Sequence, residues 1–239
     1  MTGYPIGKAA AMGCLAAMCG QSQAVAGSCG LGYVTELPIT YSQNRITVPV
    51  EINGKTVMLL LDTGAQNSFV SRATAHAVGL RIDDRTGTRL PENLAFGVGG
   101  RRVEFPGVAH QIALGGFPGH ELKIEVQSTE ANVTHGTNFD VLGMNLLAPF
   151  DLDIDLPGKR LVLYYASTPC AQPVVPLGGN LYQADLIAGD LTDGRAYTTI
   201  VMNGVALRAL VDTGAQGSVI SQAATRAPAL VRPIWRVPR

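Results

Sequence analysis

LLLDTGAQNSFVS at residues 59–71 and ALVDTGAQGSVIS at residues 209–221 are two nearly identical stretches of this sequence. An Asp-Thr-Gly tripeptide by itself is weak evidence of function, because Asp and Gly are common turn residues. Here an apolar run precedes both copies, and a Gln and a Ser follow both. The pair therefore predicts a duplicated structural unit, in which Asp62 and Asp212 occupy equivalent positions 150 residues apart.

The pattern of a β-hairpin precedes each copy. Residues 44–61, NRITVPVEINGKTVMLLL, contain two apolar and β-branched runs separated by Asn53-Gly54, and residues 196–211, AYTTIVMNGVALRALV, repeat this pattern around Asn203-Gly204. Asn-Gly between two apolar runs is the strongest short-range signal of a hairpin. We therefore predict two hairpins, each with an Asp just beyond the end of its second strand.

The composition limits both the fold class and the partners. The chain has 239 residues, of which 46% are hydrophobic and 15% charged, so it is able to bury a core as one large or two small domains. Its 28 Gly and 14 Pro favour short strands joined by tight turns, which predicts a mainly β protein. Lys and Arg together number 18, as do Asp and Glu, so no basic field is available and we expect no nucleic-acid partner.

Two equivalent acidic loops suggest a specific chemistry. Duplicated units usually pack about a pseudo-twofold axis, which would place Asp62 and Asp212 opposite one another. Two adjacent carboxylates do not both ionise readily, so the pKa of one is raised and the pair shares a proton. Such a pair can take a proton from a water that attacks an amide carbonyl, and can protonate the departing nitrogen. Asp62 and Asp212 are therefore the predicted catalytic residues.

The residues that follow each Asp are predicted to support this pair. Thr63 and Thr213 carry hydroxyl groups that can bridge the two loops. Gly64 and Gly214 permit the tight bend that brings backbone N–H groups onto the carboxylates.

From about residue 44 to residue 165 the sequence resembles the bacterial, retropepsin-like members of the pepsin and retropepsin group of aspartic peptidases. Besides the Asp-Thr-Gly-Ala segment, Val141-Leu142-Gly143 resembles the second signature of this family, which threads behind the catalytic loop and supports it. The resemblance implies a mainly β, retropepsin/pepsin-like acid protease barrel, with one complete lobe and a partial second lobe. It also implies an aspartic endopeptidase that acts on polypeptide substrates.

The segment AFGVGGRRVEF lies where this family places its flap, a mobile hairpin that closes over substrate. Gly97, Gly99 and Gly100 suit the bend of such a hairpin and are predicted to contact substrate. An ordinary Gly-rich turn remains an alternative for these three residues.

Other kinds of chemistry find little support in the sequence. Its four His residues have no spacing that resembles a metal site, and we predict neither a metal ion nor a cofactor. Ser68 and Ser218 follow the two Asp residues, but no G-x-S-x-G segment surrounds them, so a serine hydrolase is a poor fit.

The segment after Asp212 is shorter than its counterpart. Tyr165 lies 103 residues after Asp62, whereas 27 residues follow Asp212. We therefore expect a first lobe at residues 44–167 after an N-terminal segment at 27–43, and an incomplete second lobe at 168–239. The last 14 residues, RAPALVRPIWRVPR, suit neither a strand nor a helix, and a truncation or frame shift and a tail that docks on a partner both remain open.

Residues 1–26 are predicted to be a signal peptide. Lys8 precedes a short apolar run, and Ala24-Val25-Ala26 fits the small-x-small pattern that signal peptidase accepts. The run is too short to span a bilayer, so we expect a secreted or periplasmic protein without a stable membrane span. Cys29 and Cys170 would remain after cleavage, and both a disulfide and two unpaired thiols are open alternatives.

The sequence thus predicts an aspartic endopeptidase and leaves two alternatives. One is a peptide-binding module, or an inactive truncated peptidase, that binds an extended peptide without cutting it. The other is a homodimer, in which two copies of Asp62 form the catalytic pair.

Overall fold

The computed structural model describes residues 31–82, 94–97, 100–118, 122–127, 139–166, 182–188 and 194–225. These residues form short strands joined by tight turns, together with three short helices, so the predicted mainly β fold is confirmed. The predicted signal peptide, Gly99 and all four Cys residues lie outside the described residues. Within the described ranges, no helix is both long and apolar enough to cross a membrane.

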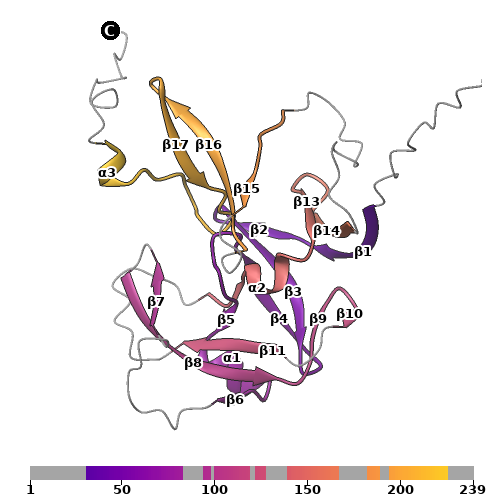
Figure 1. Ribbon diagram of the computed structural model, residues 1–239. Helices are drawn as coiled ribbons and strands as arrows, with labels where there is room; N and C mark the ends of the chain where they lie inside the picture. The colour runs from indigo at the N-terminus through magenta and orange to yellow at the C-terminus, as the bar shows by residue number, and fades with distance from the viewer. Residues whose placement is uncertain are drawn as a thin grey trace, which may run out of the picture.

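Most strands belong to one large sheet (Figure 1). Its hydrogen-bonded order is β10-β9-β3-β4-β12-β5-β11-β8-β6, and β2 and β7 pair with β3 and β8 at its side. The strands of this sheet are β2 Thr40–Ser42, β3 Arg45–Ile52, β4 Lys55–Leu61, β5 Phe69–Val70, β6 Arg81–Ile82, β7 Leu94–Gly97, β8 Gly100–Ala109, β9 Ile112–Leu114, β10 Phe117–Pro118, β11 Leu122–Gln127 and β12 Val141–Leu142. Two helices accompany it, α1 Arg72–Ala77 and α2 Met144–Leu147.

The order of this sheet has two ends, because β10 and β6 do not pair with one another. No closed ring of strands is therefore present among the described residues, and the ladder runs as an open path in which β12 lies between β4 and β5.

Two smaller sheets complete the described structure. The first has the order β1-β14-β13, with β1 Leu31–Pro38, β13 Asp151–Asp155 and β14 Arg160–Ala166. The second has the order β15-β16-β17, with β15 Ile187–Ala188, β16 Ala196–Met202 and β17 Val205–Leu210, and α3 Gln222–Thr225 follows it.

Both predicted hairpins are present. In the first, β3 pairs antiparallel with β4 from Thr47↔Leu60 to Ile52↔Lys55. In the second, β16 pairs with β17 from Tyr197↔Leu210 to Met202↔Val205. The backbone φ angles of Asn53 and Gly54 are 50° and 75°, and those of Asn203 and Gly204 are 50° and 80°. Positive φ at both turn residues matches the twist of the flanking strands, which is why Asn-Gly closes each hairpin.

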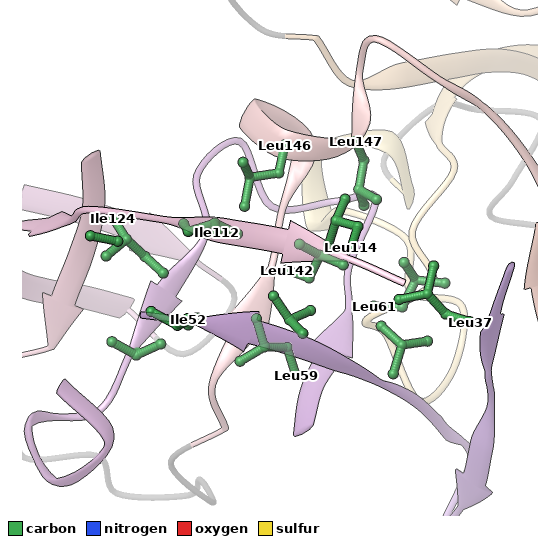
Figure 2. Packing of buried hydrophobic residues seen from close by; sticks show 14 of the residues in the cluster. Leu37, Ile52, Leu59, Leu61, Ile112, Leu114, Ile124, Leu142, Leu146 and Leu147 are labelled. Carbon is green, nitrogen blue, oxygen red and sulfur yellow. The ribbon is translucent and has the colours of Figure 1, made fainter. Parts of the chain in front are cut away.

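The hydrophobic core lies under the first hairpin (Figure 2). Alternate side chains of β3 are buried, because successive side chains of a strand point to opposite faces of its sheet. The largest fully buried side chains of the core are Leu37, Ile52, Leu59, Leu61, Ile124, Leu142, Leu147, Leu161 and Leu163. The end of β4, directly before Asp62, is therefore held in the best-packed part of the molecule.

The second hairpin is far less covered than the first. Figure 1 shows β16 and β17 extending away from the large sheet. Within residues 194–225 no side chain whose burial is described is buried, whereas the same positions of the first hairpin provide much of the core. Val50 is 1% exposed and its counterpart Ile200 is 40% exposed; Leu61 is 0% exposed and its counterpart Val211 is 38% exposed.

Candidate active site

The structure brings the two Asp-Thr-Gly loops face to face. A Cβ atom at Gly64 would lie 2.4 Å from the Cγ atom of Asp212, and a Cβ atom at Gly214 would lie 2.3 Å from the Cγ atom of Asp62. Each carboxyl group therefore packs against the glycine of the opposite loop. Only glycine allows this approach, because a real Cβ atom is never so close to another heavy atom.

Each carboxyl group is also fixed by its own loop. Asp62 Oδ1 accepts hydrogen bonds from the backbone N–H groups of Gly64 and Ala65, both at 2.9 Å. Asp212 Oδ1 accepts the equivalent bonds from Gly214 at 2.9 Å and from residue 215 at 3.1 Å. The predicted contact of loop N–H groups with both carboxylates is present, and it leaves the second oxygen of each carboxyl group outside these bonds.

Thr63 and Thr213 bridge the loops in a symmetric manner. The backbone N–H of each donates to the hydroxyl of the other, at 3.1 Å in both directions. The hydroxyl of Thr63 donates to the carbonyl of Val211 at 2.7 Å, and that of Thr213 donates to the carbonyl of Leu61 at 2.7 Å. Four hydrogen bonds thus join the chain on either side of the two Asp residues, as the sequence predicted for these two hydroxyls.

The electrostatics of the site set the protonation of Asp62. The pKa of Asp62 is raised from its usual value of 3.8 to about 6 as the net result of several causes, of which burial is the largest and the adjacent charge of Asp212 the second. The N–H groups of Gly64 and Ala65 act in the opposite direction, because they stabilise the charged form. A hydrogen bond between the side chains of Asp62 and Asp212 raises the pKa further. The pair is therefore suited to hold one shared proton.

The second signature segment supports the Asp62 loop from behind. β12 runs parallel to β4, with Val141 beside Leu60 and Leu142 beside Leu61, and Asp62 N donates to the Leu142 carbonyl at 3.0 Å. This is the arrangement that the sequence predicted for Val141-Leu142-Gly143. It anchors the backbone of Asp62 in the core sheet.

Ser68 and Asn145 complete this support. The Ser68 side chain is fully buried, accepts a hydrogen bond from Gly143 N at 2.8 Å and donates to Asn145 Oδ1 at 2.7 Å. Asn145 Oδ1 also accepts from Ser68 N at 2.7 Å. In the sequence, Ser68 stands out as a repeated residue and a poor candidate for a nucleophile, but nothing indicates Asn145 as its partner, because no pattern links positions 77 residues apart.

The Asp212 loop lacks an equivalent support among the described residues. β17 has β16 as its one neighbour in the sheet order, whereas β4 lies between β3 and β12. Ser218, the counterpart of the buried Ser68, is exposed. The hydrogen bonds that fix the second loop from outside come instead from the first hairpin and its loop.

The segment predicted as a flap forms a hairpin. β7 and β8 pair antiparallel from Leu94↔Val103 to Gly97↔Gly100. Gly97 and Gly100 are thus the paired residues at its tip, and Gly99 lies outside the described residues. Contact of these glycines with substrate stays a prediction.

Within the part of the chain that the structure describes, no group of His, Cys, Asp and Glu side chains could hold a metal ion. Asp62 and Asp212, which we call the dyad, provide two carboxyl groups, each of which accepts hydrogen bonds from two loop N–H groups. The dyad itself contains no positively charged side chain. Such a site can bind and polarise a water molecule between two oxygen acceptors of which one carries a proton.

Comparison with known proteins agrees with this geometry. Residues 48–146 match the sequence profile of a family described as aspartyl protease. The match includes the Asp62 loop and the Val141-Leu142-Gly143 segment, and it ends before Asp212. The predicted resemblance to aspartic peptidases is confirmed by this match.

Two solved structures are similar to parts of the chain. A retropepsin-like aspartic protease from Rickettsia conorii is 18% identical, covers 58% of this chain and 94% of its own length, and gives a TM-score of 0.38. The retroviral protease-like domain of Ddi1 from Leishmania major is 23% identical, covers 56% of this chain and 96% of its own length, and gives a TM-score of 0.33. No curated protein sequence matches the chain significantly.

Proposed function

We propose that this chain is an aspartic endopeptidase that hydrolyses peptide bonds through a water molecule activated by Asp62 and Asp212. The observation that carries the proposal is the reciprocal packing of each carboxyl group against the glycine of the opposite loop. Loops that only lead out of a hairpin have no reason to exclude a Cβ atom at both positions. Two carboxyl groups placed in this way form the acid–base pair that amide hydrolysis needs.

In the proposed mechanism the dyad holds a single proton. The raised pKa of Asp62, about 6, assigns this proton to Asp62 at mildly acidic pH. The Asp212 carboxylate then takes a proton from the bound water as its oxygen attacks the substrate carbonyl, and Asp62 donates its proton to the carbonyl oxygen. When the tetrahedral intermediate collapses and its C–N bond breaks, Asp212 gives the proton that it took from water to the departing nitrogen, and Asp62 takes back a proton from a hydroxyl group of the intermediate.

The internal pairing of the loops favours a dyad made within one chain. Thr63 and Gly64 already contact Val211, Thr213 and Asp212 of the same chain. A homodimer with two copies of Asp62 would require these contacts to be exchanged for contacts with a partner. The oligomeric state of the active species is thus part of the test.

Removal of each carboxylate in turn tests the proposal. Asp62→Asn and Asp212→Asn should each lower the cleavage rate of an unfolded protein substrate at mildly acidic pH by roughly a thousandfold or more, because neither variant can share a proton. A transition-state mimic of the pepstatin type should inhibit the parent. Circular dichroism provides the control that both variants remain folded.

The two variants also separate the alternatives. Cleavage that survives in Asp212→Asn but not in Asp62→Asn would favour the homodimer. Binding of an extended peptide with no cleavage, in a parent protein whose fold is intact, would favour the peptide-binding module.

A further inference from the structure

The turn between β2 and β3 contacts the second acidic loop. Asn44 Nδ2 donates a hydrogen bond to the carbonyl of Gln216, and Gln216 Nε2 donates to the carbonyl of Gln43 at 2.9 Å. Each side chain thus binds the backbone of the other segment, across 172 and 173 residues of sequence. We call this pair of bonds the 44–216 contact.

The β2–β3 hairpin places Asn44 for this contact. Gln43 and Asn44 have φ angles of 51° and 58°, and Ser42 pairs with Arg45, so the two residues form the turn of this hairpin. Positive φ at both turn residues matches the twist of the flanking strands, as in the other two hairpins. The Tyr41 hydroxyl donates to Asn44 Oδ1, which orients the amide with its N–H group toward Gln216.

Gln216 lies one residue after an N–H group that holds the second carboxylate. Residue 215 donates to Asp212 Oδ1 at 3.1 Å, and the Gln216 carbonyl lies two peptide units beyond this N–H group, so holding Gln216 limits rotation of the loop that carries this bond. The first loop has β12 and Ser68 to prevent such a rotation. The second loop has no such neighbour in the described structure, and its outer end is held by the 44–216 contact.

A related contact joins the second repeat to the first acidic loop. Arg195 stands 150 residues after Arg45, directly before β16, and its Nη1 atom donates to the carbonyl of Gly64 at 3.4 Å. The residues that precede each hairpin therefore reach the loop of the other hairpin. Arg195 thus brings a guanidinium group to the first acidic loop at Gly64.

We propose that Asn44 and Gln216 are positioning residues, which hold the Asp212 carboxyl group in register with Asp62 from the first lobe. This inference rests on the proposed function. It gives Gln216, in the second Asp-Thr-Gly-Ala-Gln segment, a role in holding the loop of Asp212. The two residues do not touch substrate and act through the backbone of the second loop. A displacement of about 1 Å at a catalytic group lowers a rate by roughly a hundredfold.

Four variants of the full chain test the proposal. Gln216→Ala removes its bond to the Gln43 carbonyl, and Asn44→Gly removes the bond to the Gln216 carbonyl together with the bond from Tyr41. Glycine keeps the left-handed backbone at position 44. Gln222→Ala is the control for the first, because Gln222 is exposed on α3. Asn203→Gly is the control for the second, because Asn203 is exposed and has a φ angle of 50°.

Two measurements are made on each variant. The first gives kcat and KM, with the concentration of active sites determined by titration with a tight inhibitor. The second gives the pKa of the Asp62 carboxyl group from an NMR titration. Gln216→Ala and Asn44→Gly should lower kcat by roughly ten- to a hundredfold with little change in KM. They should also lower the pKa of Asp62 from about 6 toward its usual range, because the Asp212 charge moves away. A residue that only stabilises the fold would change neither value in the folded fraction.

Retention of both the parent kcat and the parent pKa of Asp62 in Gln216→Ala would overturn the proposal, as would equal losses in Gln222→Ala. Should the parent show no cleavage that depends on Asp62, the proposed function has failed, and the NMR titration alone then decides whether the contact positions Asp212. If Gln216→Ala does not fold, Asn44→Gly and Tyr41→Phe provide the same comparison, since Tyr41→Phe removes only the hydroxyl that orients Asn44.

Discussion

Gly64 and Gly214 occupy their positions for a physical reason that the sequence did not suggest. The sequence suggested that these glycines allow a tight bend, but neither has a positive φ angle. Their essential property is the missing Cβ atom, which leaves room for the carboxyl group of the other loop. The sequence could not predict this reason, because the contact joins two loops 150 residues apart and exists only after the hairpins pack.

The raised pKa of Asp62 predicts that ionisation of this proposed catalytic carboxyl group lowers the stability of the fold. Between pH 3.8 and about 6 the folded chain holds a proton at Asp62 that the unfolded chain has lost. The stabilisation from this proton is complete below the unfolded pKa and disappears as the pH rises through about 6. Asp62→Asn cannot ionise, so at pH 7 it should unfold at a higher temperature than the parent, while below pH 4 the difference should vanish. Calorimetry at the two pH values measures this.

Asp155 provides the matched control of opposite sign. A hydrogen bond from Gly158 N, and then the Arg160 side chain, lower the pKa of Asp155, so its contribution is present above the unfolded pKa and is lost as the pH falls. Asp155→Asn should therefore not stabilise the protein at pH 7. A lower melting temperature for Asp62→Asn than for the parent at pH 7 would contradict the assigned coupling.

Among the elements, the position of β12 was the most predictable from the sequence. The side-chain hydrogen bonds beside it were the least predictable. The two residues of this strand and the glycine after it resemble the second signature of the family, and the predicted place of the strand behind the first loop is confirmed. The hydrogen bonds from Gly143 N to Ser68 and from Ser68 to Asn145 join residues 75 and 77 positions apart, and no periodicity or turn signal encodes such a pairing. Short motifs therefore predicted backbone placement, whereas tertiary packing determined the polar contacts.

Gly143 is predicted to be intolerant of a larger side chain. A Cβ atom there would lie 2.6 Å from the carbonyl carbon of Asn67, which belongs to the backbone of the first acidic loop and cannot rotate away. Gly143→Ala should lower the free energy of unfolding by about 1–3 kcal/mol, as overpacking of a closed site does, and should also lower activity. Urea denaturation measures the change.

Gly217→Ala is the appropriate comparison for Gly143→Ala. A Cβ atom at Gly217 meets nothing within 4 Å, and its φ angle is not in the left-handed region. This variant should leave the free energy of unfolding nearly unchanged. Equal stability of the two variants would show that the loop moves aside freely, and that β12 does not support it tightly.

At the scale of the whole molecule, the sequence predicted the two hairpins, the opposed acidic loops and the strand behind the first loop. The hairpins follow from Asn-Gly turns and alternating apolar residues, the opposed loops follow from the repeated motif, and the strand behind the first loop follows from the resemblance to aspartic peptidases. The order of the strands was not predictable, because it depends on which edges meet and local patterns carry no information on that. The 44–216 contact was missed for the same reason.

The exposure of the second hairpin predicts association of the protein in solution. Val201 is 71% exposed and Val219 is 81% exposed, and the edge of β17 away from β16 is unpaired among the described strands. Apolar side chains beside a free strand edge favour contact with another chain. Val201→Thr combined with Val219→Thr keeps two β-branched residues but replaces a methyl group with a hydroxyl at each position. The concentration at which the protein associates should rise by about tenfold or more, as measured by light scattering.

Met58→Thr is the control for this prediction. Met58 is 46% exposed on β4, whose two edges are both paired, so its replacement removes exposed apolar surface without a free strand edge nearby. It should change association little. If Met58→Thr reduces association as much as the double variant does, apolar exposure in general drives self-contact, and the second hairpin has no special part in it. If the parent stays monomeric over the whole concentration range, the open edge of β17 is covered in solution, and the protein is a monomer that builds its dyad from one chain.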